Sequence, residues 1–122
     1  MGVTNSLGEK VLEDTIASLI SNATHVAIGT GTTAFNQADT TLETEVVRNA
    51  RQTYSETSDT VTISGYFNTT QANGSDITEY GVFDAATSGL MISRDLATSI
   101  AKTDSVEIWV DETYNVTVTL NT

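Results

Sequence analysis

The alternation of apolar and polar residues constrains the fold of this chain most strongly. In the segment 60–68, Val61, Ile63, Gly65 and Phe67 share one parity, and the residues between them are mostly polar. This period of two is that of a β-strand with one buried face. The last segment repeats it: Val106, Ile108, Val110, Tyr114, Val116, Val118 and Leu120 share one parity, which only Glu112 interrupts. We therefore expect two long strands, with a bend or bulge near 111–112 in the second.

Shorter β-like runs fill the rest of the chain after residue 23. Segments 24–28, 47–56, 77–83 and 90–96 are rich in β-tolerant residues, and turn-forming residues separate them. The runs 47–56 and 60–68 predict a hairpin. A length of 122 residues suits one domain. The predicted fold is mainly β, an antiparallel β-sandwich or barrel-like single domain over 1–122, with its β part at 24–120.

A helix is expected only at the start of the chain, over residues 6–22. Ser6 and Glu9 have the spacing of a capping box. Apolar residues then recur at helical spacing and form one apolar face of the helix. We predict that this face is an interface made by Val11, Leu12, Ile16, Leu19 and Ile20.

The negative charge of the chain limits the kinds of molecule that it can bind. The chain has 16 Asp and Glu against 5 Lys and Arg, a net charge of −11, and the acids are dispersed along the sequence. Such a surface repels phosphates and anionic membranes, so neither nucleic acid nor membrane insertion is expected. Multimolar salt would screen the self-repulsion. We expect a halophilic source, with an acidic secreted or phage protein as the alternative.

Residues suited to catalysis or metal binding are sparse. Cysteine is absent, and His25 is the single histidine, so thiolate sites and paired-histidine zinc sites are excluded. The segment 29–31 reads Gly-Thr-Gly, but no helical stripe or lysine follows it as a nucleotide site requires. Asp111 with Glu112, or Asp39 with Glu43 and Glu45, lack the spacing of a calcium loop. We therefore expect no enzyme activity, cofactor or metal.

Four segments in fixed order resemble a known family. They are Val26-Ala-Ile-Gly-Thr-Gly-Thr-Thr33, Asp39-Thr-Thr-Leu-Glu-Thr-Glu-Val-Val-Arg48, Ile77-Thr-Glu-Tyr-Gly-Val-Phe-Asp84 and Leu90-Met-Ile-Ser-Arg94. This pattern resembles the N-terminal domain of tail-collar fibre proteins of tailed phages and related small virion proteins. The resemblance implies a virion structural protein of a tailed virus, here a haloarchaeal one, assembled in the host cytoplasm.

The resemblance also guides the expected role. The fibre proteins continue into a shaft that this sequence does not contain, so we expect a tail, baseplate or fibre-attachment component. It would work as a homo-oligomer, a ring or trimer, in contact with other virion proteins. A capsid decoration or turret protein is one alternative. Another is a domain that contacts carbohydrate on the host surface through Trp109, Tyr66 and Tyr80.

One polar contact is expected inside the fold. Arg48 and Glu79 both lie among strand hydrophobics. A charge-assisted contact between them would fix the register of two strands.

Overall fold

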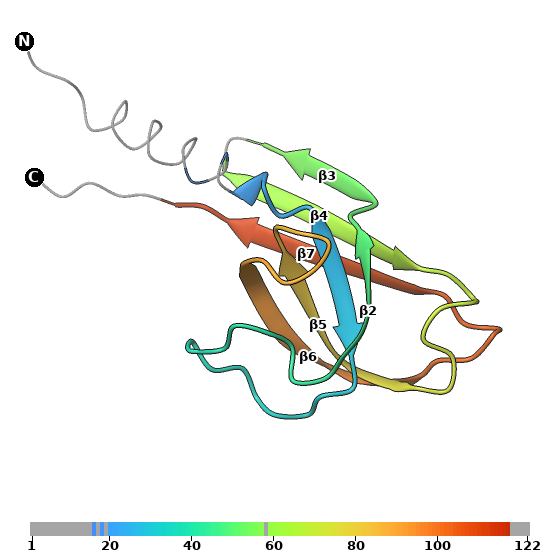
Figure 1. Ribbon diagram of the computed structural model, residues 1–122. Coiled ribbons are helices and arrows are strands. Elements are labelled where there is room, and N and C mark those ends of the chain that lie inside the picture. Colours follow the sequence, from blue (N-terminus) through green and yellow to red (C-terminus); the bar gives the residue numbers. More distant parts are fainter. Residues whose placement is uncertain (1–15, 17, 19, 58, 118–122) are drawn as a thin grey trace, which may run out of the picture.

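The computed structural model describes residues 16, 18, 20–57 and 59–117, and these form two antiparallel sheets. The strands are β1 (His25–Gly29), β2 (Glu45–Ala50), β3 (Thr53–Glu56), β4 (Thr60–Phe67), β5 (Asp76–Phe83), β6 (Met91–Ala101) and β7 (Ile108–Asn115). Sheet A has the order β2-β1-β5-β6, and sheet B has the order β3-β4-β7 (Figure 1). The prediction of a mainly β, antiparallel fold is confirmed.

The main core lies between the two sheets. Val26 and Ile28 of β1 and Val82 of β5 belong to the same buried cluster as residues of β4 and β7. On β4, the predicted inward side chains Val61, Ile63 and Phe67 are fully buried. The sheets approach closely at Gly65, where a Cβ atom would lie 2.6 Å from Cβ of Val26.

The opposite face of sheet A carries a second, smaller cluster. Ala27 and Phe83 pack there against Leu42, which belongs to the long connection between β1 and β2. We call residues 30–44 the β1–β2 loop; it is drawn in teal in Figure 1. Sheet A is therefore covered by sheet B on one face and by this loop on the other.

The predicted strand over 47–56 is two strands in different sheets. β2 ends at Ala50 in sheet A, and β3 begins at Thr53 in sheet B. The core-facing parity changes at the crossing, from odd-numbered Val47 in β2 to even-numbered Tyr54 in β3. The β3–β4 hairpin is present as predicted, with Thr53 opposite Ser64.

The bulge predicted near 111–112 is wrong. β7 pairs with β4 in unbroken register from Ile108 to Asn115, so Glu112 keeps the parity of Val110 and Tyr114 and points towards the core side. Irregularities occur instead in sheet A, between Ile28 and Gly29, Ile77 and Glu79, and Val82 and Phe83.

The predicted helix over 6–22 falls largely outside the described residues. Ile16, Ser18 and Ile20 have helical conformation, and a turn from Ile20 to Ala23 leads into β1. Of the predicted interface residues, Val11, Leu12 and Leu19 lie outside the described part of the chain.

Candidate interaction site and the buried polar network

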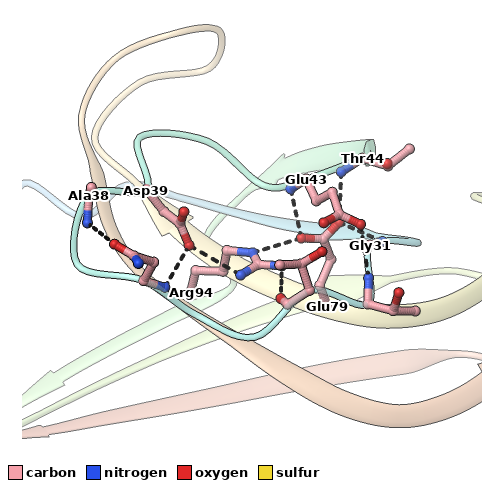
Figure 2. A network of polar contacts seen from close by, with 10 residues as sticks. Gly31, Ala38, Asp39, Glu43, Thr44, Glu79 and Arg94 are labelled. Carbon is pink, nitrogen blue, oxygen red and sulfur yellow. Dashed lines mark hydrogen bonds and ion pairs between the residues drawn. The ribbon is translucent and has the colours of Figure 1, made fainter.

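A buried carboxylate lies under the β1–β2 loop. Glu79 of β5 is 0% exposed, and its two oxygens accept three backbone N–H groups (Figure 2). The donors are Gly31 N at 2.7 Å, Glu43 N at 2.9 Å and Thr44 N at 2.8 Å. Because Gly31 and Thr44 stand at opposite ends of the loop, one side chain holds both ends together.

An arginine completes this network from the neighbouring strand. Arg94 of β6 is 4% exposed and donates its Nε to Glu79 Oε1 at 2.9 Å. Its Nη2 donates to the carbonyl of Thr33 at 2.7 Å, and its Nη1 lies 3.3 Å from Asp39 Oδ2. Arg94 thus neutralises Glu79 and fixes the middle of the loop; Figure 2 shows these contacts. We call this set the Glu79 network: Gly31, Thr33, Asp39, Glu43, Thr44, Glu79 and Arg94.

Local structure explains why Glu79 faces the loop. Ile77 belongs to the core between the sheets, and in a regular strand Glu79 would face the same side. The irregularity between Ile77 and Glu79 lets Ile77 enter the core while Glu79 faces the β1–β2 loop. Gly31 is also required, because a Cβ there would collide with the Glu79 carboxylate.

The hydrogen bonds and the charge of Arg94 keep the buried Glu79 ionised, as a structural role requires. Burial alone would raise the pKa of Glu79, but the donors of Thr44, Arg94, Glu43 and Gly31 together hold it below its usual range. Among the described residues, no buried side-chain nitrogen or oxygen lacks a hydrogen-bond partner. The buried polar atoms of the network are therefore used inside the fold.

The four segments that carry the family resemblance meet at this network. Gly31 comes from the first, Glu43 and Thr44 from the second, Glu79 from the third and Arg94 from the fourth. Sequence reasoning singled out Glu79 but missed Arg94. The available signal was that Arg94, like Glu79, is a charge within an otherwise β-like run.

The prediction of an Arg48–Glu79 ion pair is wrong, because each of the two residues pairs with another residue. Arg48 Nη2 lies 2.7 Å from Glu45 Oε1, and its guanidinium carbon lies 3.6 Å from the centre of the Phe83 ring. Its Nη1 donates to the carbonyls of Ala85 and Ser88, each at 2.9 Å. Arg48 therefore fastens the β5–β6 turn to β2, where it cannot also meet Glu79.

Two described residues of the predicted interface, Ile16 and Ile20, lie beside a depression on the surface. Ile16 is 40% exposed, and Ile20 packs partly against the core. The depression is also lined by Leu90 and Ile92, and Leu90 is 65% exposed. We call this the Ile16 patch: Ile16, Ile20, Leu90 and Ile92. Ile16 and Ile20 belong to the predicted interface, whereas Ile92 comes from β6 and Leu90 from the turn before β6.

The three aromatic residues suggested for carbohydrate contact are separated in exposure. Trp109 is 55% exposed and stacks on Tyr66, with ring centres 4.7 Å apart and planes tilted by 43°. Tyr80 is half-buried and packs against the core. Of the three, only Trp109 is exposed, and Tyr66 and Tyr80 are both half-buried.

A carboxylate pair that the sequence did not reveal spans the gap between the sheets. Burial first, and then repulsion from Asp95 of β6, raises the pKa of Glu112 to about 7. Next to it Ser93 Oγ and Tyr114 Oη lie 2.6 Å apart, and burial raises the pKa of Tyr114 to about 12. The alternation marked Glu112 as unusual, but nothing in it identified Asp95 as its neighbour.

The other polar candidates do not assemble into a site. His25 Nδ1 is 2.8 Å from Thr24 Oγ1, and Asp39 and Glu45 bind Arg94 and Arg48 respectively. Within the described residues, no group of three or more His, Asp or Glu side chains could hold a metal ion. In the same part of the chain, no helix is long and apolar enough to cross a membrane.

Comparison of the sequence with models of known protein families finds no match, and a search of curated proteins finds no relative.

Proposed function

We propose that this chain is a virion structural protein of a tailed virus, and that it works by self-assembly and protein contacts as a tail, baseplate or fibre-attachment component. The observation that carries the proposal is the contrast between its polar and apolar residues. The motif residues Glu79, Arg94 and Arg48 are engaged inside the fold, whereas large apolar side chains such as Leu90, Ile16 and Trp109 are exposed.

The rest of the proposal follows from that contrast. In this account the chain is one β-sandwich domain with an N-terminal helix over 6–22, which contributes Ile16 and Ile20 to the Ile16 patch. Identical copies each pack this patch against a neighbouring copy, and such contacts close into a ring or trimer when each patch meets a different surface of its neighbour. Such contacts supplement the modest core of a small domain. The dispersed acidic surface suits a halophilic host.

Purified particles test the proposal. Particles released by the cells whose genome encodes this chain are banded on a density gradient, and the chain is quantified in them by mass spectrometry. We expect a fixed copy number per particle and symmetric density of matching shape in electron cryo-microscopy maps. The position of that density distinguishes a tail component from a capsid decoration or turret protein. Absence of the chain from intact particles would rule out the virion role.

The exposed Trp109 favours one alternative, a host-surface adhesion domain that binds carbohydrate. Trp109 leaves more than half of its surface free and is braced by Tyr66, and sugars bind to flat aromatic faces of this kind. A glycan array probed with the full chain and with Trp109→Ala separates the two functions. Saturable binding that depends on Trp109 would favour adhesion.

A further inference from the structure

A narrow apolar groove opens between β6 and β7. Its volume is about 180 Å³, and it is lined from sheet A by Ile77, Tyr80, Ala97 and Ile100. From sheet B it is lined by four consecutive residues of β7, 108–111. Consecutive strand residues point to opposite faces, so lining by four in a row means that the groove runs along the edge of β7 itself.

Both strands that flank the groove are edge strands in the described part of the chain. β6 is the last strand of sheet A, and β7 is the last strand of sheet B. An edge strand presents backbone N–H and C=O groups that no neighbouring strand uses, and an added strand can pair with them. The groove therefore combines an apolar slot with an available backbone edge.

The size of the groove favours a peptide side chain over a small molecule. Pockets for drug-sized ligands usually measure about 300–1,000 Å³, well above this groove. A slot of this size instead suits one large apolar side chain. In strand addition, the backbone pairs along the edge while alternate side chains fill pockets of this kind.

The surroundings of the groove are acidic. Asp111 lines the groove, and β6, β7 and the connection between them carry four more acids: Asp95, Asp104, Glu107 and Glu112. Lys102 is the only cation between residues 95 and 112, and it is 2% exposed, with its Nζ donating to Asn73 Oδ1 and the Thr103 carbonyl. A second copy of the chain would bring a further charge of −11 to this rim, which opposes self-association through the groove.

We propose that the β6–β7 groove is a docking site for an extended segment of a different, basic protein. The segment pairs with the free edge of β7, inserts one apolar side chain between Ile100 and Val110, and places Lys or Arg beside the acidic rim. This inference rests on the proposed function, because it names the kind of neighbour that a particle component would bind.

A peptide selection tests the proposal. A random 12-residue peptide library is selected on the immobilised full chain, and the bound sequences are compared with those selected on Ile100→Ser and Val46→Ser. Ile100 and Val46 are matched, because they are 38% and 39% exposed and lie on the two opposite edge strands of sheet A. Trp109 is the single tryptophan of the chain and lines the groove, so its fluorescence reports binding of each selected peptide.

We expect selected peptides to alternate apolar and polar residues and to be rich in Lys and Arg. They should shift Trp109 emission saturably, and Ile100→Ser should weaken binding by about tenfold or more, as expected for loss of a buried aliphatic contact. Val46→Ser should leave the affinity unchanged. No enriched sequences, acidic consensus sequences, or equal binding to Ile100→Ser would each overturn the proposal.

Self-association would also overturn it. If Trp109 emission shifts with concentration of the chain alone, and Ile100→Ser abolishes that shift, the groove is an interface between copies. Failure of the selection would leave the virion role intact if the chain is found in particles. Conversely, a chain absent from particles could still bind basic strands in this groove.

Discussion

At the scale of single residues, the account depends on the Glu79 network. Two buried opposite charges cost free energy to desolvate, and they are tolerated when every lone pair and proton has a partner. Glu79 meets that condition through three backbone donors and Arg94. Its value lies in positioning: it adds a buried side-chain link between Gly31 and Thr44 to the backbone hydrogen bond from Thr30 N to the Thr44 carbonyl.

Replacing Glu79 by Gln tests this role. The change leaves Arg94 buried without its main counter-ion and removes an acceptor that backbone donors need, so unfolding should become easier by about 3–5 kcal/mol. Urea denaturation measures the loss. Because the folded state lowers the pKa of Glu79, its contribution is present above the usual carboxyl range and is lost in acid. The difference between the two proteins should therefore shrink as the pH falls below about 4.

The control is Glu45→Gln, which removes the same charge from a carboxylate whose side chain is 33% exposed. Exposed ion pairs contribute about 0–1 kcal/mol, so this variant should unfold almost like the wild type. Equal effects of the two substitutions would mean that the Glu79 network does not hold the loop.

Glu112 predicts a pH dependence of opposite sign. The folded state raises its pKa to about 7, with Asp95, Tyr80 and Tyr114 around it. The folded protein then binds a proton that the unfolded chain releases near pH 4.5, so stability falls as pH rises from there to about 7. Glu112→Gln mimics the protonated form and should be about 1–2 kcal/mol more stable than wild type above pH 7, after allowance for partial solvent screening.

Asp111→Asn is the matched control for that experiment, because Asp111 is exposed on the other face of the same strand. It should shift the unfolding curve at every pH by a similar, small amount. A wild-type curve that is flat between pH 4.5 and 7 would show that the fold does not raise the pKa of Glu112.

At the scale of elements, the strands with strict alternation were predicted well. β4 buries the residues that its pattern indicated, and the β3–β4 hairpin forms as expected. What failed were features that depend on tertiary contacts. The crossing between β2 and β3 changes the core-facing parity between Val47 and Tyr54, and Glu112 stays in register on the core side of β7 without a bulge.

The partners of the buried charges also depend on tertiary contacts and could not be predicted from the sequence. A charged residue among strand hydrophobics indicates that its side chain needs a polar partner, but the sequence pattern does not identify that partner. Arg48 and Arg94 were equally suited to Glu79 by sequence, and only the sheet order β2-β1-β5-β6 places Arg94 on the strand next to Glu79. Arg48 lies two strands away from Glu79 and binds the β5–β6 turn.

The close approach of the sheets at Gly65 gives a prediction at this scale. Gly65→Ala places a Cβ 2.6 Å from Val26, so the sheets must separate locally, at a cost of about 1–3 kcal/mol. Thermal or urea unfolding measures it. Gly74→Asn is the comparison: Gly74 has φ +88° with nothing within 4 Å of the added Cβ, and Asn tolerates this backbone conformation. A Gly65→Ala protein as stable as Gly74→Asn would contradict the packing described.

At the scale of the whole molecule, charge sets the conditions for folding. A net charge of −11 on 122 residues repels itself at low ionic strength. We expect the free energy of unfolding to rise with KCl, and most of the gain to be complete by about 1 M, where the Debye length is about 3 Å. Denaturation curves across a KCl series measure this. A stability that is unchanged or decreases with KCl would argue against a halophilic origin.

The central claim is that the Ile16 patch binds neighbouring copies of this chain. Sedimentation equilibrium in multimolar KCl tests it most directly, on the wild type, on Ile16→Asp in the Ile16 patch, and on the charge-matched Ser55→Asp on exposed β3. The account predicts a closed oligomer for the wild type and for Ser55→Asp, and dissociation towards the 13.0 kDa monomer for Ile16→Asp. A wild-type protein that stays at monomer mass at every concentration would contradict it.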